Sequence, residues 1–141
     1  GYGAQFMATR PTRLAVVPAG YADGLDVRLA GVGSVLVRGH RAPIVGSVCM
    51  DSITIDVTDV EVSPGDDVVL IGAQGENRIE ATEMANWIGT VPHEILCRTG
   101  SRIERVYTQS DKNHEKLLKQ HHLHHLDDSP HFCAIIGPSS R

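Results

Sequence analysis

The sequence predicts a mainly β fold, a small antiparallel β-barrel or sandwich with one short helix, followed by a disordered or irregular C-terminal tail. Short runs rich in Val, Ile and Leu recur at close spacing, with Gly, Pro, Asn and Asp between them. Only one segment carries hydrophobic residues at helical spacing. Beyond residue 107 the chain becomes polar and rich in His. We therefore expect one domain over residues 1–107 and a separate tail over residues 108–141.

The clearest strand pattern lies at residues 52–57. Ile53, Ile55 and Val57 alternate there with polar residues, which predicts a strand with one buried face. Gly39 is expected to end a strand that begins at Ser34, and residues 74–77 are expected to form a hairpin turn. The expected strands are 14–18, 34–38, 42–50, 52–57, 67–72 and 101–107.

The single expected helix spans about residues 81–88. Ile79, Met84, Ala85 and Ile88 form a weak stripe with a period near 3.6 residues. Gly89 follows the stripe and can end the helix, because glycine readily adopts a positive φ.

Composition excludes several classes of partner. The net charge is -4, with 13 basic and 17 acidic residues, which is unsuited to binding nucleic acid or an anionic membrane surface. No apolar run approaches the ~20 residues needed to span a bilayer, and no secretory signal is visible at the start. The three cysteines show no CxxC spacing. We expect free thiols in a cytoplasmic protein, with Cys49 and Cys97 buried as small hydrophobic residues.

Several short segments resemble the alanine racemase family, in the same order along the chain. The GYADG and PIVGSVCMD segments are specific in combination, and the others are individually weak. The matching segments are YGA at 2–4, GYADG at 20–24, PIVGSVCMD at 43–51, DVTDV at 56–60, GDDVVLIG at 65–72, EILC at 94–97 and RIERVY at 102–107. The resemblance covers about three quarters of the chain and places residues 1–107 on the family's C-terminal β-domain.

The resemblance implies a racemase that interconverts L- and D-alanine and supplies D-alanine for the bacterial cell wall. Pyridoxal 5'-phosphate supplies the electron sink in this family, and the protein positions acids and bases on both sides of the substrate. A lysine on an N-terminal barrel binds the cofactor, and a tyrosine on the partner subunit's β-domain faces it. By its place in the YGA segment, Tyr2 is expected to be that catalytic tyrosine here. An isolated tyrosine has a pKa near 10, so a phenolate base needs neighbouring positive charge, which the family's barrel provides.

The resemblance implies three further site residues, Met50, Tyr21 and His93, and turn chemistry gives Asp23 a supporting role. The backbone N–H of Met50 is expected to hold the substrate carboxylate, and Tyr21 is expected to line the substrate entrance. Asp23 is expected to stabilise its own turn by hydrogen bonding to backbone N–H groups. His93 departs from the family, which usually has a tyrosine before Glu94 at the entrance. An imidazole is shorter than a phenol, so a wider entrance and tolerance of serine form one hypothesis.

The chain offers no suitable lysine for the cofactor. Lys112, Lys116 and Lys119 all lie in the polar tail, whereas a cofactor-binding lysine is expected in a desolvated pocket. We therefore expect the cofactor to be held by an N-terminal barrel domain, the functional unit to be a homodimer, and this chain alone to be inactive.

Other functions stay open at this point. A His-rich tract could bind metal opportunistically, or serve an interaction module, although a dedicated metal site is not expected because the histidines are not spread over a fixed scaffold. A non-catalytic remnant is a second alternative. The β-domain of a related pyridoxal-phosphate decarboxylase is a third. The tract comprises His121, His122, His124 and His125, with His114, His131 and Cys133 nearby.

Overall fold

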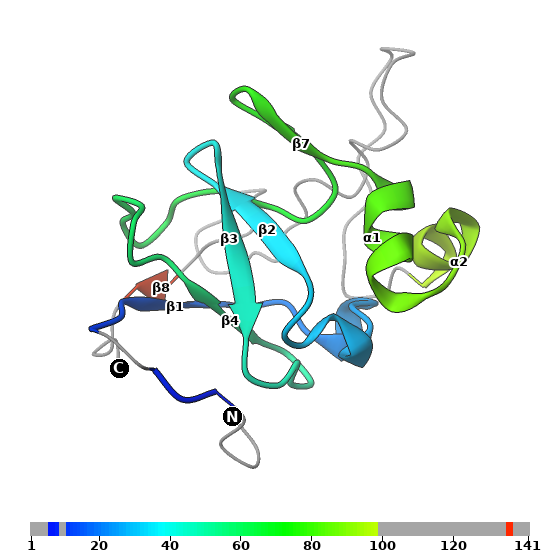
Figure 1. Cartoon of the computed structure of the whole chain (residues 1–141), viewed down its shortest axis with the longest axis horizontal. Helices are drawn as coiled ribbons and strands as arrows, with labels where there is room; N and C mark the ends of the chain where they lie inside the picture. Colours follow the sequence, from blue (N-terminus) through cyan, green and yellow to red (C-terminus); the bar gives the residue numbers. More distant parts are fainter. Residues whose placement is uncertain (1–5, 9–10, 99–134, 137–141) are drawn as a thin grey trace.

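The computed structural model describes residues 6–8, 11–98 and 135–136. Its strands are β1 (Leu14–Val17), β2 (Ser34–Val37), β3 (His40–Val45), β4 (Ile53–Asp56), β5 (Val68–Val69), β6 (Gly72–Gln74), β7 (Asn77–Ile79) and β8 (Ile135–Ile136). Six of them form one curled antiparallel sheet, in the order β5-β2-β3-β4-β1-β8, and β6 pairs with β7 as a separate hairpin (Figure 1). The predicted mainly β fold is confirmed as a half-barrel.

The centre of the sheet follows the alternation in the sequence. Ala15 and Val17 of β1 lie opposite Ile55 and Ile53 of β4, and Ile55 also lies opposite Ile44 of β3. All five side chains are buried. Since successive side chains of a strand point to opposite faces, this register places every second residue in the core.

The β2–β3 hairpin turns where the sequence predicts a break. Arg38 and Gly39 have φ values of 54° and 78°, which gives the two positive φ angles of a tight hairpin turn. The turn also contacts the second hairpin, because the Gly39 N–H donates to Gln74 Oε1 at 2.8 Å and Asn77 Nδ2 donates to the Gly39 carbonyl at 2.7 Å. The predicted turn at residues 74–77 is confirmed and holds the two hairpins together.

Two helices are present in the described part, where one was predicted. Helix α1 (Ala81–Ile88) matches the prediction and ends at Gly89, whose φ is 74°. Helix α2 (Pro92–Cys97) was missed, because only Ile95 is buried in it and a single buried residue gives no periodic signal. The prediction that Cys97 is buried is wrong: Cys97 is exposed at the end of α2. Cys49 is intermediate in exposure rather than fully buried.

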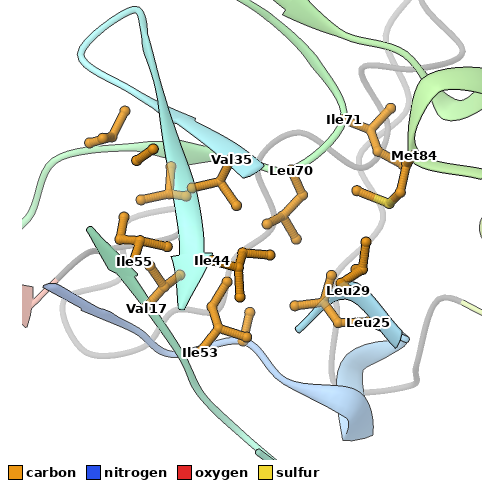
Figure 2. Close-up of a cluster of buried hydrophobic side chains, with 14 of the residues drawn as sticks. Val17, Leu25, Leu29, Val35, Ile44, Ile53, Ile55, Leu70, Ile71 and Met84 are labelled. Carbon is orange, nitrogen blue, oxygen red and sulfur yellow. The ribbon is translucent and has the colours of Figure 1, made fainter. Parts of the chain in front are cut away.

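The hydrophobic core joins the sheet to α1 and to the segment that carries two 3-10 turns, η2 (Tyr21–Asp23) and η3 (Val27–Leu29). Figure 2 shows Val17, Ile53 and Ile55 at one end of this cluster, and Ile71 and Met84 at the other. Leu25 and Leu29 lie on the segment that carries the turns, and Leu29 is fully buried. The segment that holds the candidate site residues is therefore anchored by its own leucines.

Three strands differ from the prediction. The expected strand 42–50 is too long, since β3 ends at Val45 and is followed by Gly46, whose φ of 71° is not a strand conformation. The run 67–72 is not one strand: β5 ends at Val69, and β6 begins at Gly72, whose φ of 131° allows a change of direction. Residues 135–136 of the tail form β8, which pairs with β1 and was not predicted. The expected strand 101–107 lies outside the described residues. None of the helices in the described residues combines the length and the hydrophobicity that a membrane span requires.

Candidate functional site

The GYADG segment forms turn η2, which is stabilised by its own aspartate. The Asp23 carboxylate is only 4% exposed, and its Oδ2 accepts a hydrogen bond from the Gly20 N–H at 2.9 Å. The Asp23 N–H donates in turn to the Gly20 carbonyl at 2.9 Å, and Gly24 closes the turn with a φ of 109°. The predicted role of Asp23 is confirmed.

The same turn lies directly against the Cys49–Met50 segment. The Tyr21 N–H donates to the Cys49 carbonyl at 2.9 Å, and the Ala22 N–H donates to the Met50 carbonyl at 2.8 Å. Gly20 makes this approach possible, since a Cβ at that position would stand 2.2 Å from the Cys49 carbonyl oxygen. Two segments that the sequence separates by more than twenty residues thus form one unit carrying Tyr21 and Met50.

Both of these residues are accessible. The side chains of Tyr21 and Met50 are 46% and 54% exposed. Within the described part of the chain, the backbone N–H of Met50 donates to no protein acceptor, while its carbonyl is engaged by Ala22. A fixed, accessible N–H is a suitable donor for a carboxylate.

A cavity of about 310 Å³ opens beside Tyr21, between the 3-10 turns and the end of α2. Figure 1 shows this turn region, in blue, next to the two helices. The cavity is lined by Tyr21, Gly24, Leu25, Asp26, Val27 and Arg98.

An ionic cluster at this cavity was not predicted from the sequence. Asp26 accepts from Arg28 through both carboxylate oxygens, at 2.9 and 2.8 Å, and it also accepts from Arg98. The Asp26 side chain is 7% exposed, whereas those of Arg28 and Arg98 are 48% and 43% exposed. The hydrogen bonds from Arg28, with a further contribution from Arg98, hold the pKa of Asp26 far below its ordinary value despite burial.

The cluster connects the η3 turn to both helices. Arg28 Nη1 donates to the Ile88 carbonyl at the end of α1, at 3.1 Å. Arg98 Nη2 donates to Glu94 Oε1 at 3.0 Å, and Thr90 Oγ1 donates to the same oxygen at 2.8 Å. Through Arg28 and Arg98, Asp26 therefore connects the cavity wall to both helices.

Replacing Asp26 by asparagine is expected to destabilise the domain near neutral pH by about 1–2 kcal/mol. The reason is that residue 26 loses its charge-assisted hydrogen bonds with two partly solvated arginines. A carboxylate with a lowered folded-state pKa stabilises the fold above its unfolded pKa, and the stabilisation is lost as the pH falls towards the folded value. The difference between the two proteins should therefore shrink below about pH 4. Urea unfolding midpoints at about pH 7, 5 and 3 measure it.

The exposed Glu61 offers a matched control. Glu61→Gln removes one carboxylate without touching the cluster and should leave the midpoint nearly unchanged at each pH. A constant difference between Asp26→Asn and the unmodified chain down to about pH 3 would contradict the electrostatic origin of the effect.

The other predicted site residues are only partly described. His93 is exposed on α2, the helix that is followed directly by Arg98 of the cavity wall. Tyr2 lies outside the described residues, as do the His-rich tract and all three lysines. The part of the chain that the structure describes thus contains no lysine to bind a cofactor aldehyde.

Comparison with known proteins gives consistent matches for residues 1–107, which match the family described as alanine racemase, C-terminal domain. The chain is 49% identical over 107 residues to alanine racemase 2 of Caldanaerobacter subterraneus subsp. tengcongensis, covering 75% of this chain and 28% of that protein. Against the alanine racemase of Halothermothrix orenii it is 48% identical, with the same coverage. The chain thus spans little more than a quarter of the length of these relatives.

Solved structures agree with this match. The alanine racemase from Bacillus anthracis with bound L-Ala-P gives a TM-score of 0.72 at 38% identity, covering 77% of this chain and 28% of that one. The Bartonella henselae alanine racemase, with covalently bound pyridoxal phosphate, gives 0.67 at 38% identity, covering 76% and 29%. Both segments of the docked Tyr21–Met50 unit lie within the matched residues 1–107. The chain therefore belongs to the alanine racemase C-terminal domain family.

Proposed function

We propose that residues 1–107 act as the β-domain of a pyridoxal-phosphate alanine racemase, with Tyr2 as the acid/base on one face of the substrate. The observation that carries the proposal is the Tyr21–Met50 unit, in which the Met50 N–H has no acceptor among the described residues and stands beside an exposed tyrosine. The tail at 108–141 lies outside the catalytic domain in this proposal.

In this proposal, each residue of the site has a separate chemical role. The cofactor, when bound by a lysine of a barrel domain, supplies the electron sink that makes the α-proton of alanine acidic. The Met50 N–H holds the substrate carboxylate and so orients the α-carbon. Tyr2 then moves a proton at its phenol oxygen on the face opposite the lysine. Tyr21 and His93 line the entrance.

The proposal requires two subunits. One subunit's barrel holds the cofactor, and the β-domain of the other supplies Tyr2 and Met50, so that each active site is completed across a homodimer. Such an enzyme would work in the cytoplasm, where D-alanine is made for peptidoglycan.

A chimaera tests this proposal. Residues 1–107 replace the matching C-terminal segment of the Halothermothrix orenii alanine racemase, to which they are 48% identical. We expect a dimer that binds pyridoxal phosphate and racemises alanine, whereas the chain alone does neither. A folded, cofactor-loaded dimeric chimaera without racemase activity would instead identify a non-catalytic remnant.

His93 gives a prediction about specificity in the same chimaera. With the shorter imidazole at the entrance, the chimaera is expected to turn over serine as well as alanine. His93→Tyr should shift the ratio of kcat/KM values towards alanine by roughly tenfold, the scale on which a pocket separates substrates that differ by one small group. Exclusive use of alanine by the unmodified chimaera would reject a role for His93 in substrate choice.

A further inference from the structure

We propose that His93 and Cys97 together form a two-ligand site for a soft divalent cation of the Zn²⁺ class. The two residues are four positions apart on α2, which places them on the same face of the helix. The Cys97 Sγ and His93 Nε2 atoms are 3.9 Å apart. A thiolate and an imidazole are the two protein ligands that Zn²⁺ most often uses.

The separation of these atoms suits one shared metal ion. With Zn–S near 2.3 Å and Zn–N near 2.0–2.1 Å, two ligands of a tetrahedral ion stand about 3.6 Å apart. The observed 3.9 Å lies a few tenths of an ångström above that value. Both side chains are exposed, so a small rotation of either brings them to the metal-binding distance.

The charged groups near His93 and Cys97 are paired with one another, so both side chains remain available to bind a metal ion. Glu94, which lies between the two residues in sequence, is occupied by Thr90 and Arg98. The positive charge of Arg98 is offset by Asp26 and Glu94. No group of three His, Cys, Asp or Glu side chains gathers anywhere in the described residues, and the proposed site therefore has two protein ligands from α2, with the remaining positions assigned to water. The site is therefore exchangeable and distinct from the buried, four-ligand sites that stabilise folds.

The pair depends on His93, which stands where the family usually has a tyrosine. With a tyrosine at position 93, Cys97 would have no imidazole one turn away. If the proposed function holds, a cation bound here would also narrow the substrate entrance beside His93, but the site itself does not rest on that function.

Titration of the full chain with Co²⁺ under reducing conditions tests the site. A thiolate bound to Co²⁺ gives a charge-transfer absorption band that histidine ligands alone do not produce, so the His-rich tract cannot imitate the signal. We expect a band that saturates with increasing Co²⁺, has the intensity of one thiolate–Co²⁺ bond per chain, and is displaced by Zn²⁺. Cys97→Ser should abolish it, and His93→Asn should weaken Co²⁺ binding by roughly 10–100-fold, because the second ligand is then no longer held nearby.

Matched variants exclude the other thiols. Cys49→Ser and Cys133→Ser should both keep the band and its midpoint. Absence of the band in the unmodified chain, or its persistence in Cys97→Ser, would overturn the proposal. A band that His93→Asn leaves unchanged would overturn it as well, because Cys97 would then bind the metal without His93. Both substituted residues of α2 are exposed, so the variants should unfold at the same urea concentration as the unmodified chain.

Discussion

Replacing Tyr2 by phenylalanine in the chimaera is expected to lower kcat for alanine racemisation by about 10²–10⁴-fold, the range typical for loss of a positioned general acid/base. Phenylalanine keeps the ring and removes only the phenol oxygen, so binding of cofactor and substrate should change little. Racemisation in deuterated water, followed separately from L- and D-alanine, measures the loss. The two faces of the substrate use different bases. The rate of deuterium incorporation should therefore fall by different factors when the reaction starts from L-alanine and when it starts from D-alanine.

Tyr21→Phe is the matched control for this experiment. Tyr21 is the only other tyrosine of the GYADG and YGA segments, and in the proposal it stands at the entrance without exchanging a proton. Its substitution should alter KM more than kcat. Equal losses of kcat in the two variants, or unchanged kcat in Tyr2→Phe, would remove Tyr2 from the catalytic role.

Local patterns of the sequence were sufficient to predict much of the sheet. The alternation of Ile53, Ile55 and Val57 predicts β4 because a half-buried strand has a period of exactly two residues. The turn at Gly39 was predictable because a positive φ favours glycine. The stripe of Met84, Ala85 and Ile88 predicts α1, and all three residues are buried. Each of these elements is determined by residues within a few positions of one another.

Features that depend on distant residues were not predictable in this way. Asp26 and Arg98 are 72 positions apart, and nothing local indicates that they meet. Asp26 is the N-cap of η3 and Arg98 follows Glu94 at i,i+4, so each residue has an ordinary local explanation. Likewise, the sequence gives no reason for Tyr21 to approach Met50; the family resemblance alone put both residues in one site. Cys97 was predicted to be buried on residue type, but its short helix buries only Ile95.

The approach of Tyr21 to Met50 depends on Gly20, and Gly20→Ala is expected to destabilise the domain by about 3 kcal/mol or more. The added Cβ would lie 2.2 Å from the Cys49 carbonyl oxygen and 2.6 Å from the carbonyl carbon and oxygen of Met50. These are backbone atoms, so no side-chain rotation relieves the clash. The turn must move away, and the hydrogen bonds from Tyr21 and Ala22 are lost with it. Urea unfolding measures the stability, and amide hydrogen exchange at Tyr21 and Ala22 reports the two bonds.

Gly31→Ala separates steric overlap from backbone conformation. Gly31 has a φ of 78°, but an added Cβ there meets nothing within 4 Å, so its cost should be only about 1 kcal/mol of backbone strain. Gly20 has an extended φ of -147°, which alanine adopts readily, so any larger loss at Gly20 must come from the contact with residues 49 and 50. Since the same contact sets the position of the Met50 N–H, a chimaera carrying Gly20→Ala that still folds should bind alanine more weakly. If Gly20→Ala and Gly31→Ala were equally mild and both amides stayed protected, the two segments would not be held together by the close approach at Gly20.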